Sequence, residues 1–506
     1  MIGVGKVGTA LVAAMGAFAL ASCGGGGSSV VSPGEGAFAT GGTGGTGTGT
    51  GTGGNGIASS DCPTGFINLG TVASGTLRSC GIPQLVIGSL TVPFRPGTAY
   101  RIDGRVAVGE DQGSDAQAPR AGTRSGVLTI EPGVTVFGGI SEFLVVNRGS
   151  RIVADGTASR PIIFTSLNDL NSGPDLRGQW GGIVIAGRAP INRCPPTTTA
   201  FPTNPTACEF RFEAIQTINW GGNAPTDSSG TLRYVQVKEA GFEVAPNEEL
   251  NGITFGGVGN GTLVDFVQVH GAADDAVEFF GGTVNVRHLV LDQWDDDGYD
   301  TDEGFTGSAQ YVINFTDAPT EESRCFEMSS GGSTSGGVPL LRSNPRVSNF
   351  VCRLGLAATA FDARQHSGVV LNSGTRADFL NGIFVSENTR IPCIDVDGAS
   401  TIAAPAPTFR STVLSCAGGP FRTTDGDQDA APATLFAAGN DNLSTGYIPT
   451  LSQVFINGGN EAARAATNPT TTSAFLLAVN FIGAVSGPGD TWYVGWTCGL
   501  AGATPC

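Results

Sequence analysis

Lysine is almost missing from this chain of 506 residues, because Lys238 is the only lysine after Lys6. Charged residues make up 14% of the sequence, well under the roughly 25% of ordinary globular proteins. The formal net charge is −17. Nucleic-acid binding needs clustered lysine and arginine, so the composition argues against a nucleic-acid partner. Long helices are not expected either, because lysine, glutamate and arginine are scarce.

Zinc ligands are scarce as well. The only histidines are His270, His288 and His366, and no two cysteines have the CxxC spacing. A zinc site is therefore not expected. What the chain does have is glycine, with 78 residues, between short runs of valine, isoleucine, phenylalanine and threonine. That texture favours short strands and tight turns.

The first 23 residues have the pattern of an export signal. Lys6 is followed by an apolar stretch over residues 7–20, which is too short to span a bilayer comfortably, and then by Leu20-Ala21-Ser22-Cys23. Because the cut site ends in cysteine, the segment resembles a bacterial lipoprotein signal. The resemblance implies that residues 1–22 are removed and that Cys23 carries acyl chains. Gly24 is not the aspartate that retains lipoproteins in the inner membrane, which implies the outer membrane, on its surface or periplasmic face.

The sequence predicts two further regions. Residues 24–60 are mainly glycine, threonine and serine, so we expect residues 23–60 to be the lipidated cysteine and a flexible tether, roughly 33 Å from end to end. Residues 61–506 are expected to form the folded body. Within it the segments 110–126, 194–229 and 320–345 interrupt the strand pattern and read as loops.

Ten cysteines remain once Cys23 is set aside, an even number that suggests up to five disulfides in an exported chain. Spacing does not prove connectivity, and pairing between sequence neighbours is the natural expectation: Cys62–Cys80, Cys194–Cys208, Cys325–Cys352, Cys393–Cys416 and Cys498–Cys506. The sequence separations in the third and fourth pairs are close to the spacing of the internal repeats described in the next paragraph. These two disulfides could therefore join neighbouring repeats.

Internal repetition indicates the architecture. A glycine followed by a β-rich run recurs at Gly230, Gly261, Gly282 and, more weakly, Gly307. Repeats spaced by twenty to thirty residues, without room for a helix, are typical of stacked coils. We therefore expect an all-β fold, a right-handed parallel β-helix. A β-propeller is the alternative, although its blades are about 40–50 residues long.

The central segment resembles a family of exported bacterial β-helix proteins, most of them lipoproteins or cell-surface proteins. The motifs that carry the resemblance are Trp180-Gly-Gly-Ile-Val-Ile-Ala-Gly-Arg-Ala-Pro-Ile-Asn192 and Asp274-Asp-Ala-Val-Glu-Phe-Phe-Gly-Gly-Thr-Val284. The resemblance is convincing over about residues 125–315. It implies the β-helix fold and a surface location, and it implies no particular reaction.

Acidic residues crowd into residues 274–303, which hold ten carboxylates. Aligning Thr262 with Thr283 places Asp274 over Asp295 and Asp275 over Asp296 in adjacent coils. Carboxylates that close need a cation or protons, and calcium prefers several hard oxygen ligands. The candidate ligands are Asp274, Asp275, Glu278, Asp295, Asp296, Asp297, Asp300 and Asp302. The alternative is a solvated acidic turn.

The same acids allow two enzyme hypotheses. A glycoside hydrolase uses a pair of carboxylates, which Asp274-Asp275 and Asp295-Asp296 would supply. A polyuronate lyase uses calcium and a base. Lys238 and His270 are the candidate bases, because they align when Val237 is placed on Val269. The nearby Trp294 is a candidate for stacking on a sugar ring.

Three functional hypotheses follow. The first is a non-enzymatic lipoprotein of the outer membrane whose calcium-stabilised β-helix binds a glycan or a surface partner. The second is a polysaccharide lyase or glycoside hydrolase on the same scaffold. The third is an accessory lipoprotein that delivers ligand to an outer-membrane transporter.

Overall fold

A computed structural model describes residues 57–195, 205–212, 217–245, 248–320, 323–335, 338–356, 367–403, 405–423, 430–500 and 504–506. The chain divides into two compact units, residues 1–54 and residues 55–506, and every described residue belongs to the second. The predicted signal peptide, Cys23 and nearly all of the predicted tether therefore lie outside the described residues. His366 does too.

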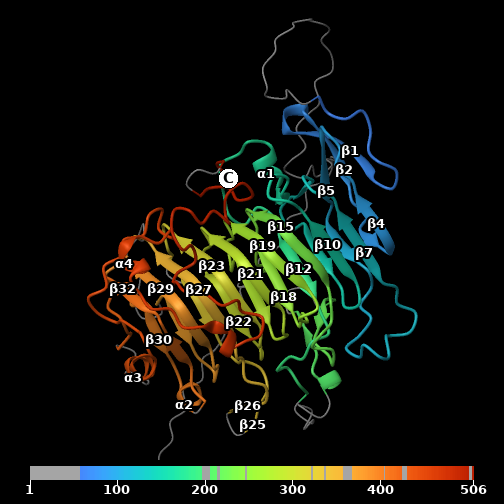
Figure 1. The fold of residues 1–506 in the computed structure, drawn as a ribbon. Helices are drawn as coiled ribbons and strands as arrows, with labels where there is room; N and C mark the ends of the chain where they lie inside the picture. The colour runs from blue at the N-terminus through green and yellow to red at the C-terminus, as the bar shows by residue number, and fades with distance from the viewer. Residues whose placement is uncertain are drawn as a thin grey trace, which may run out of the picture. The chain divides into compact units, whose positions relative to one another are not determined.

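Two long sheets build the second unit (Figure 1). Sheet A consists of β1 (Ile67–Val72), β2 (Leu77–Gly81), β4 (Gly88–Val92), β5 (Thr98–Ile102), β7 (Gly126–Ile130), β8 (Thr135–Gly138), β10 (Arg151–Asp155), β11 (Ile162–Ser166), β15 (Gly230–Lys238), β19 (Leu263–His270), β21 (Asn285–Asp292), β23 (Ser308–Thr316), β27 (Arg346–Leu354), β29 (Asp378–Ser386), β31 (Thr408–Arg410) and β32 (Val413–Cys416). Sheet B consists of β3 (Leu85–Val86), β6 (Arg105–Val108), β9 (Phe143–Val146), β12 (Gly182–Ala186), β18 (Ile253–Gly256), β20 (Val277–Phe280), β22 (Asp297–Asp302), β24 (Arg324–Met328), β28 (Val369–Leu371) and β30 (Ile394–Val396).

The chain alternates between the two sheets, and each strand pairs in parallel with its counterpart one coil later. Residues Val237, Val269 and Leu291 are partners in β15, β19 and β21. The antiparallel pairing of β1 with β2 lies at the N-terminal end of sheet A. This arrangement confirms the predicted parallel β-helix.

A bend divides the long strands of sheet A into two limbs. The residue at the bend has a positive φ, for example 51° at Tyr234 and 56° at Phe266. Before β15 the two limbs are separate: β4, β7 and β10 form one, β2, β5, β8 and β11 the other, and both pair with β15. The coil therefore has three faces, with sheet B as the third.

The core fills the space between these faces. In β15 the apolar side chains of Leu232, Val235 and Val237 are buried, and they belong to one continuous cluster that runs along the helix. The bend at Tyr234 shifts the usual alternation, so side chains three residues apart both point inward. Complete burial of each aliphatic side chain contributes about 1.5–3 kcal/mol.

A C-terminal strap, residues 440–500 and 504–506, lies across the outer face of the second limb of sheet A (Figure 1). It begins beside the last coils and runs back to β15. Thr467 bonds Asn381 in β29, Phe481 accepts from Asn349 in β27, and Trp496 accepts from Gln236 in β15. The strap packs on outward apolar side chains, among them Val290 and Ile313.

The bend residues of four successive coils form an aromatic stack beneath the strap. The ring centroids of Tyr234 and Phe266 are 4.4 Å apart, those of Phe266 and His288 are 4.2 Å apart, and those of His288 and Tyr311 are 4.9 Å apart. Trp496 packs edge-on against Phe266 at 5.9 Å. The positive φ of the bend residues places these rings on the outside of the β-helix, where the strap covers them.

The five expected disulfides are all present: Cys62–Cys80, Cys194–Cys208, Cys325–Cys352, Cys393–Cys416 and Cys498–Cys506. The third and fourth disulfides join neighbouring coils, as expected. Cys325 in β24 is joined to Cys352 in β27, the next sheet A strand along the chain. Because β27 pairs with β23, the strand that precedes β24, the disulfide connects one coil to the next.

Helices are short and peripheral: α1 (Leu167–Leu170), α2 (Ala399–Ile402), α3 (Ala431–Ala438) and α4 (Gly459–Ala462). Phe436 of α3 packs against Phe409 and Phe421 at the end of the last coil. Three two-stranded ribbons, β13 (Phe210–Arg211) with β14 (Asn219–Trp220), β16 (Glu243–Ala245) with β17 (Glu248–Glu249) and β25 (Thr334–Ser335) with β26 (Val338–Pro339), decorate the coils. No helix within the described ranges has the length and hydropathy required to cross a membrane.

Candidate cation site

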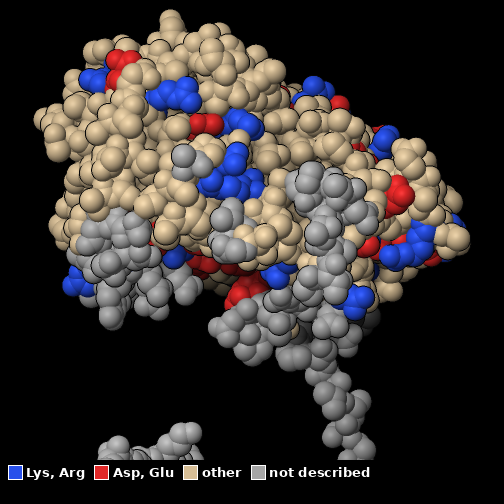
Figure 2. Space-filling model, turned by 90° about the horizontal axis from the view of Figure 1, so that it is seen from below, with Lys and Arg blue, Asp and Glu red and all other residues tan. Residues whose placement is uncertain are grey.

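One row of outward side chains on sheet B changes from apolar to acidic along the helix. In register order the row is Val145, Val184, Thr254, Glu278, Asp300 and Glu327. The two valines lie under the ribbon of β13 and β14, in a cluster that includes Trp220. The carboxylates follow where this cover ends. On the face seen in Figure 2, by contrast, charged side chains are few and lie in small groups.

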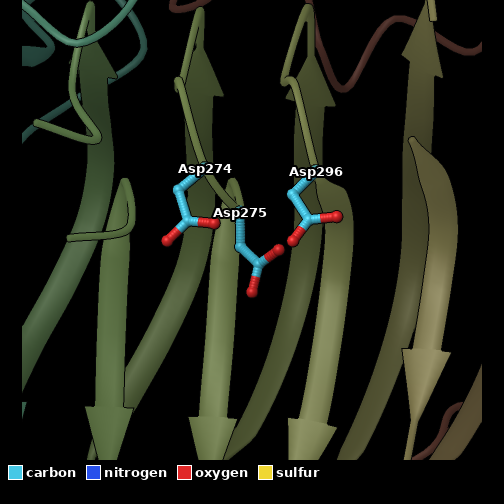
Figure 3. Close-up of side chains that lie close together, drawn as sticks. All are labelled: Asp274, Asp275 and Asp296. Carbon is cyan, nitrogen blue, oxygen red and sulfur yellow. The ribbon is translucent and has the colours of Figure 1, made fainter. Parts of the chain in front are cut away.

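Three carboxylates converge at the edge of sheet B. Asp274 and Asp275 lie in the turn between β19 and β20, and Asp296 lies in the turn between β21 and β22. One carboxylate oxygen from each lies within 4.8 Å of the others, and Figure 3 shows the three groups drawn together from adjacent coils. The turns stack because Ala276 N donates to Asp297 O at 2.8 Å.

The expected register is wrong by one residue. Val277 pairs with Tyr299, a 22-residue offset, so Asp274 falls beside Asp296 and not over Asp295. The alignment of Thr262 with Thr283 misses a residue because β21 begins three residues after Gly282, whereas β19 begins two residues after Gly261. Asp275 and Asp296 are neighbours nonetheless.

A second group shares a member with the first. Oxygens of Asp275, Glu278 and Asp300 also lie within 4.8 Å of one another. Glu278 and Asp300 are register partners on β20 and β22. We call the five residues Asp274, Asp275, Glu278, Asp296 and Asp300 the acidic cluster.

The acidic cluster is electrostatically unfavourable as it stands. Burial, followed by repulsion from neighbouring carboxylates, raises the pKa of Asp275 well above its usual value, and the pKa values of Glu278 and Asp300 rise for the same reasons. Glu278 and Asp300 share a hydrogen bond, which requires that one of them keep a proton. Protons or a cation must therefore offset the charge.

A basic residue that the sequence reasoning missed borders the cluster. Arg324 Nη1 lies 2.8 Å from Glu327, 3.5 Å from Asp297 and 3.7 Å from Asp296. Arg324 is the register partner of Asp297. The insertion between β23 and β24 hid this alignment, because it breaks the repeat period.

The other predicted ligands have separate roles. Asp297 is 3% exposed, burial raises its pKa, and its Oδ1 is buried without a hydrogen-bond partner among the described residues. Asp295 pairs with Arg177. Asp302 accepts bonds from Ser329 Oγ and from the backbone nitrogens of Glu303 and Gly331, so it shapes a turn.

The donors at the acidic cluster fit a hard divalent cation. Every ligand atom in the two groups is a carboxylate oxygen, which suits calcium or magnesium and does not suit zinc or copper. The buried Oδ1 of Asp297 next to these groups is an acceptor that lacks a donor. Calcium tolerates irregular coordination by six to eight oxygens, whereas magnesium demands near-octahedral geometry, so a cluster of several carboxylates favours calcium.

Lys238 and His270 are register partners, as the alignment of Val237 with Val269 predicts. Neither is an available base. Lys238 Nζ lies 2.7 Å from Asp169 and donates to the backbone oxygen of Cys506 at 2.9 Å. His270 lies between two carboxylates, which raise its pKa to about 10 against the opposing effect of burial. Both side chains are engaged with carboxylates, so neither stands free as the base that the lyase hypothesis needs.

A cleft of about 480 Å³ opens beside the same turns. Asp175, Leu176 and Arg177 line it together with residues of the turns after β19 and β21, including Gln293 and Asp295. Leu176 is 44% exposed and offers an apolar wall. The volume is within the range of small-ligand pockets.

Trp294 is not placed to stack on a sugar ring. Its side chain is fully buried in the interior of the β-helix, within the main core cluster. The position follows the end of β21, where the chain turns inward over the core. The expectation that Trp294 faces a ligand is therefore wrong.

Comparison with known proteins agrees with this architecture. No curated protein and no solved structure shows significant similarity to the chain. Residues 102–434, about two thirds of the sequence, match the family model described as a pectate-lyase-like β-helix domain. The chain belongs to this family of pectate-lyase-like β-helix domains.

Proposed function

We propose that this protein is a β-helix scaffold that holds calcium at the acidic cluster and, through it, binds an acidic glycan. The observation that carries the proposal is the convergence of five carboxylates from successive coils. The raised pKa values of Asp275, Glu278 and Asp300 indicate repulsion between carboxylates in the folded chain, which a cation would relieve. Calcium held on a few protein carboxylates keeps coordination positions for further oxygens, such as those of a uronate.

Binding is better supported than lyase chemistry, since Lys238 and His270 are both tied up in ion pairs. The cleft lined by Asp175, Leu176 and Arg177 would take part of a ligand that continues past the cation. The row of outward positions along sheet B offers a regular surface to a repeating polymer.

We place the protein outside the cytoplasm, anchored to the outer membrane by acyl chains on Cys23. The five disulfides support an oxidising compartment, because such bonds are rare in the cytoplasm. Replacement of Cys23 by serine should release the protein from the membrane fraction and abolish palmitate labelling. Retention of Cys23→Ser in the membrane would contradict the anchor.

A glycoside hydrolase is the second candidate, favoured by one observation. Glu278 and Asp300 share a hydrogen bond and both have raised pKa values, which is how a hydrolase keeps one carboxyl protonated as an acid. Hydrolysis would release new reducing ends from polysaccharide, and Glu278→Gln would abolish that release while leaving the fold intact.

The test of the first proposal is the melting temperature of the purified protein in EDTA, in millimolar calcium and in millimolar magnesium. Calcium at about 100 times its dissociation constant adds about 2.7 kcal/mol, which corresponds to a rise of several degrees. Binding to polygalacturonate or alginate is then compared in calcium and in EDTA. The same melting temperature in all three buffers would rule out the cation site.

A further inference from the structure

His270 connects the segments that surround the acidic cluster. It is the last residue of β19 and is 5% exposed. Its Nδ1 lies 2.5 Å from Asp292 Oδ2, at the end of β21, and its Nε2 lies 3.0 Å from Asp175 Oδ2. The strap covers it, since Gln268 beside it exchanges hydrogen bonds with the backbone of Cys498.

Both partners of His270 are connected to the turn between β21 and β22, which carries Asp296 of the acidic cluster. Asp292 is four residues before Asp296, and it also accepts a bond from Gln268 at 3.0 Å. Asp175 is two residues before Arg177, which pairs with Asp295. The histidine therefore ties its own turn to the turn of the next coil along two routes.

Apart from His270, backbone hydrogen bonds hold the beginning of the turn that carries Asp274 and Asp275. Its first three residues are Gly271, Ala272 and Ala273, none of which has a polar side chain. Backbone bonds join it to the neighbouring turns: Gly271 N donates to Asp292 O at 2.9 Å, and Ala272 O accepts from Asp295 N at 3.0 Å. A charged side chain buried at the start of this turn adds the rigidity that these single bonds lack.

We infer that His270 is a positioning residue for the cation site, which holds the turns 271–276 and 293–296 at the separation where their carboxylates converge. The inference rests on the proposed function, because it assigns His270 a part in that same site. The imidazolium does not contact the cation. It acts through Asp292 and Asp175, in the manner of residues that orient metal ligands from outside the first coordination sphere.

The chain provides a matched control for the test. His288 is also a histidine of the β19–β21 pair, and its Nδ1 lies 2.7 Å from Asp265. It stands at the bend, stacked on Phe266, and not at the end of the strand. His270→Gln should weaken calcium binding about tenfold in calorimetric titration with calcium chloride, whereas His288→Gln should leave the affinity unchanged.

A second measurement does not depend on calcium. Hydrogen–deuterium exchange of the protein in EDTA should be faster in residues 271–276 of His270→Gln and unchanged there in His288→Gln. If His270→Gln fails to fold, Asp175→Asn replaces it, because the Asp175 side chain is 57% exposed and its loss leaves the core intact. This variant should also weaken calcium binding and speed exchange in residues 271–276.

The outcomes separate the inference from the proposed function. Calcium binding by the wild type with equal affinity in His270→Gln would overturn the positioning role and leave the cation site standing. Absence of calcium binding in the wild type would overturn the proposed function, and unchanged exchange in the turn would overturn the positioning role as well. Equal weakening in both histidine variants would show a general loss of stability and would also overturn it.

Discussion

Asp275 Oδ1 accepts a hydrogen bond from the backbone nitrogen of Asp297, 2.9 Å away on the next coil. The same carboxylate belongs to both groups of the acidic cluster. The Asp275 side chain therefore forms a hydrogen bond between two coils and also belongs to both groups of the candidate cation site. An amide at this position would keep the acceptor and remove the charge, which allows the two roles to be separated.

The variant Asp275→Asn should lose its response to calcium. In EDTA its free energy of unfolding should equal or exceed the wild-type value by about 1 kcal/mol, because a repelled buried charge is gone. The increase in melting temperature with calcium should disappear. Asp155→Asn, in an exposed pair with Arg233 on another face, is the control and should respond to calcium as the wild type does.

The stability of the calcium-free protein should fall as the pH rises. The folded-state pKa values of Asp275, Glu278 and Asp300 are raised above their ordinary values near 4, so folding takes up protons. The stabilising protonated forms are lost as the pH rises through the folded-state pKa values. In EDTA the melting temperature at about pH 5 should exceed that at about pH 8, and calcium should reduce the difference. A melting temperature that rises with pH in EDTA would contradict the raised values.

His270 should remain charged well above neutral pH. Its pKa rises to about 10 in the folded state from an ordinary value of 6.5, so its contribution to stability is complete below 6.5 and is lost as the pH rises through 10. NMR of the imidazole should show a protonated ring at about pH 8. A neutral ring at that pH would contradict the ion pairs of His270 with Asp175 and Asp292.

Removal of the Cys393–Cys416 disulfide should lower stability measurably. The bond closes a loop with a sequence separation of 23, for which the loss of the cross-link costs about 3 kcal/mol. Unfolding of the double variant Cys393→Ala/Cys416→Ala in guanidinium would measure the loss. The shorter Cys498–Cys506 loop, with a separation of 8, should cost less when removed in the same way.

Trp294→Ala should destabilise the protein without changing its affinity for calcium. Truncation of a fully buried tryptophan costs about 3–5 kcal/mol through lost contacts and a cavity. Chemical denaturation measures the first effect and calorimetric titration of the folded variant the second. A weaker glycan affinity at unchanged stability would restore Trp294 as a ligand contact.

Much of the β-helix was predictable because its coils repeat. The runs after Gly230, Gly261, Gly282 and Gly307 correspond to β15, β19, β21 and β23, and the pairing of Val237 with Val269 follows from them. An even number of cysteines in an export-like chain predicted disulfides, and the structure confirms the expected pairing between sequence neighbours. The crowding of acids was visible for the same reason, because adjacent coils place equivalent residues side by side.

The features that escaped prediction depend on contacts between distant segments. The one-residue error at Asp274 arose because glycine-threonine pairs do not mark the strand start uniformly. The ion pairs of Lys238 and His270 involve Asp169 and Asp175, which precede them by more than sixty residues in the non-repeating segment between β11 and β12. A sequence signal for the bends did exist, since Tyr234, Phe266, His288 and Tyr311 recur at one place in the repeat.

The strap also gives the molecule an order of completion in time. Because Tyr234 and Phe266 precede Trp496 in the chain, a β-helix that folds from its N-terminus exposes an apolar side until the strap docks. Chaperones and proteases would meet that side in every unfinished chain. The docking of residues 440–500 therefore ends the exposure of the aromatic stack.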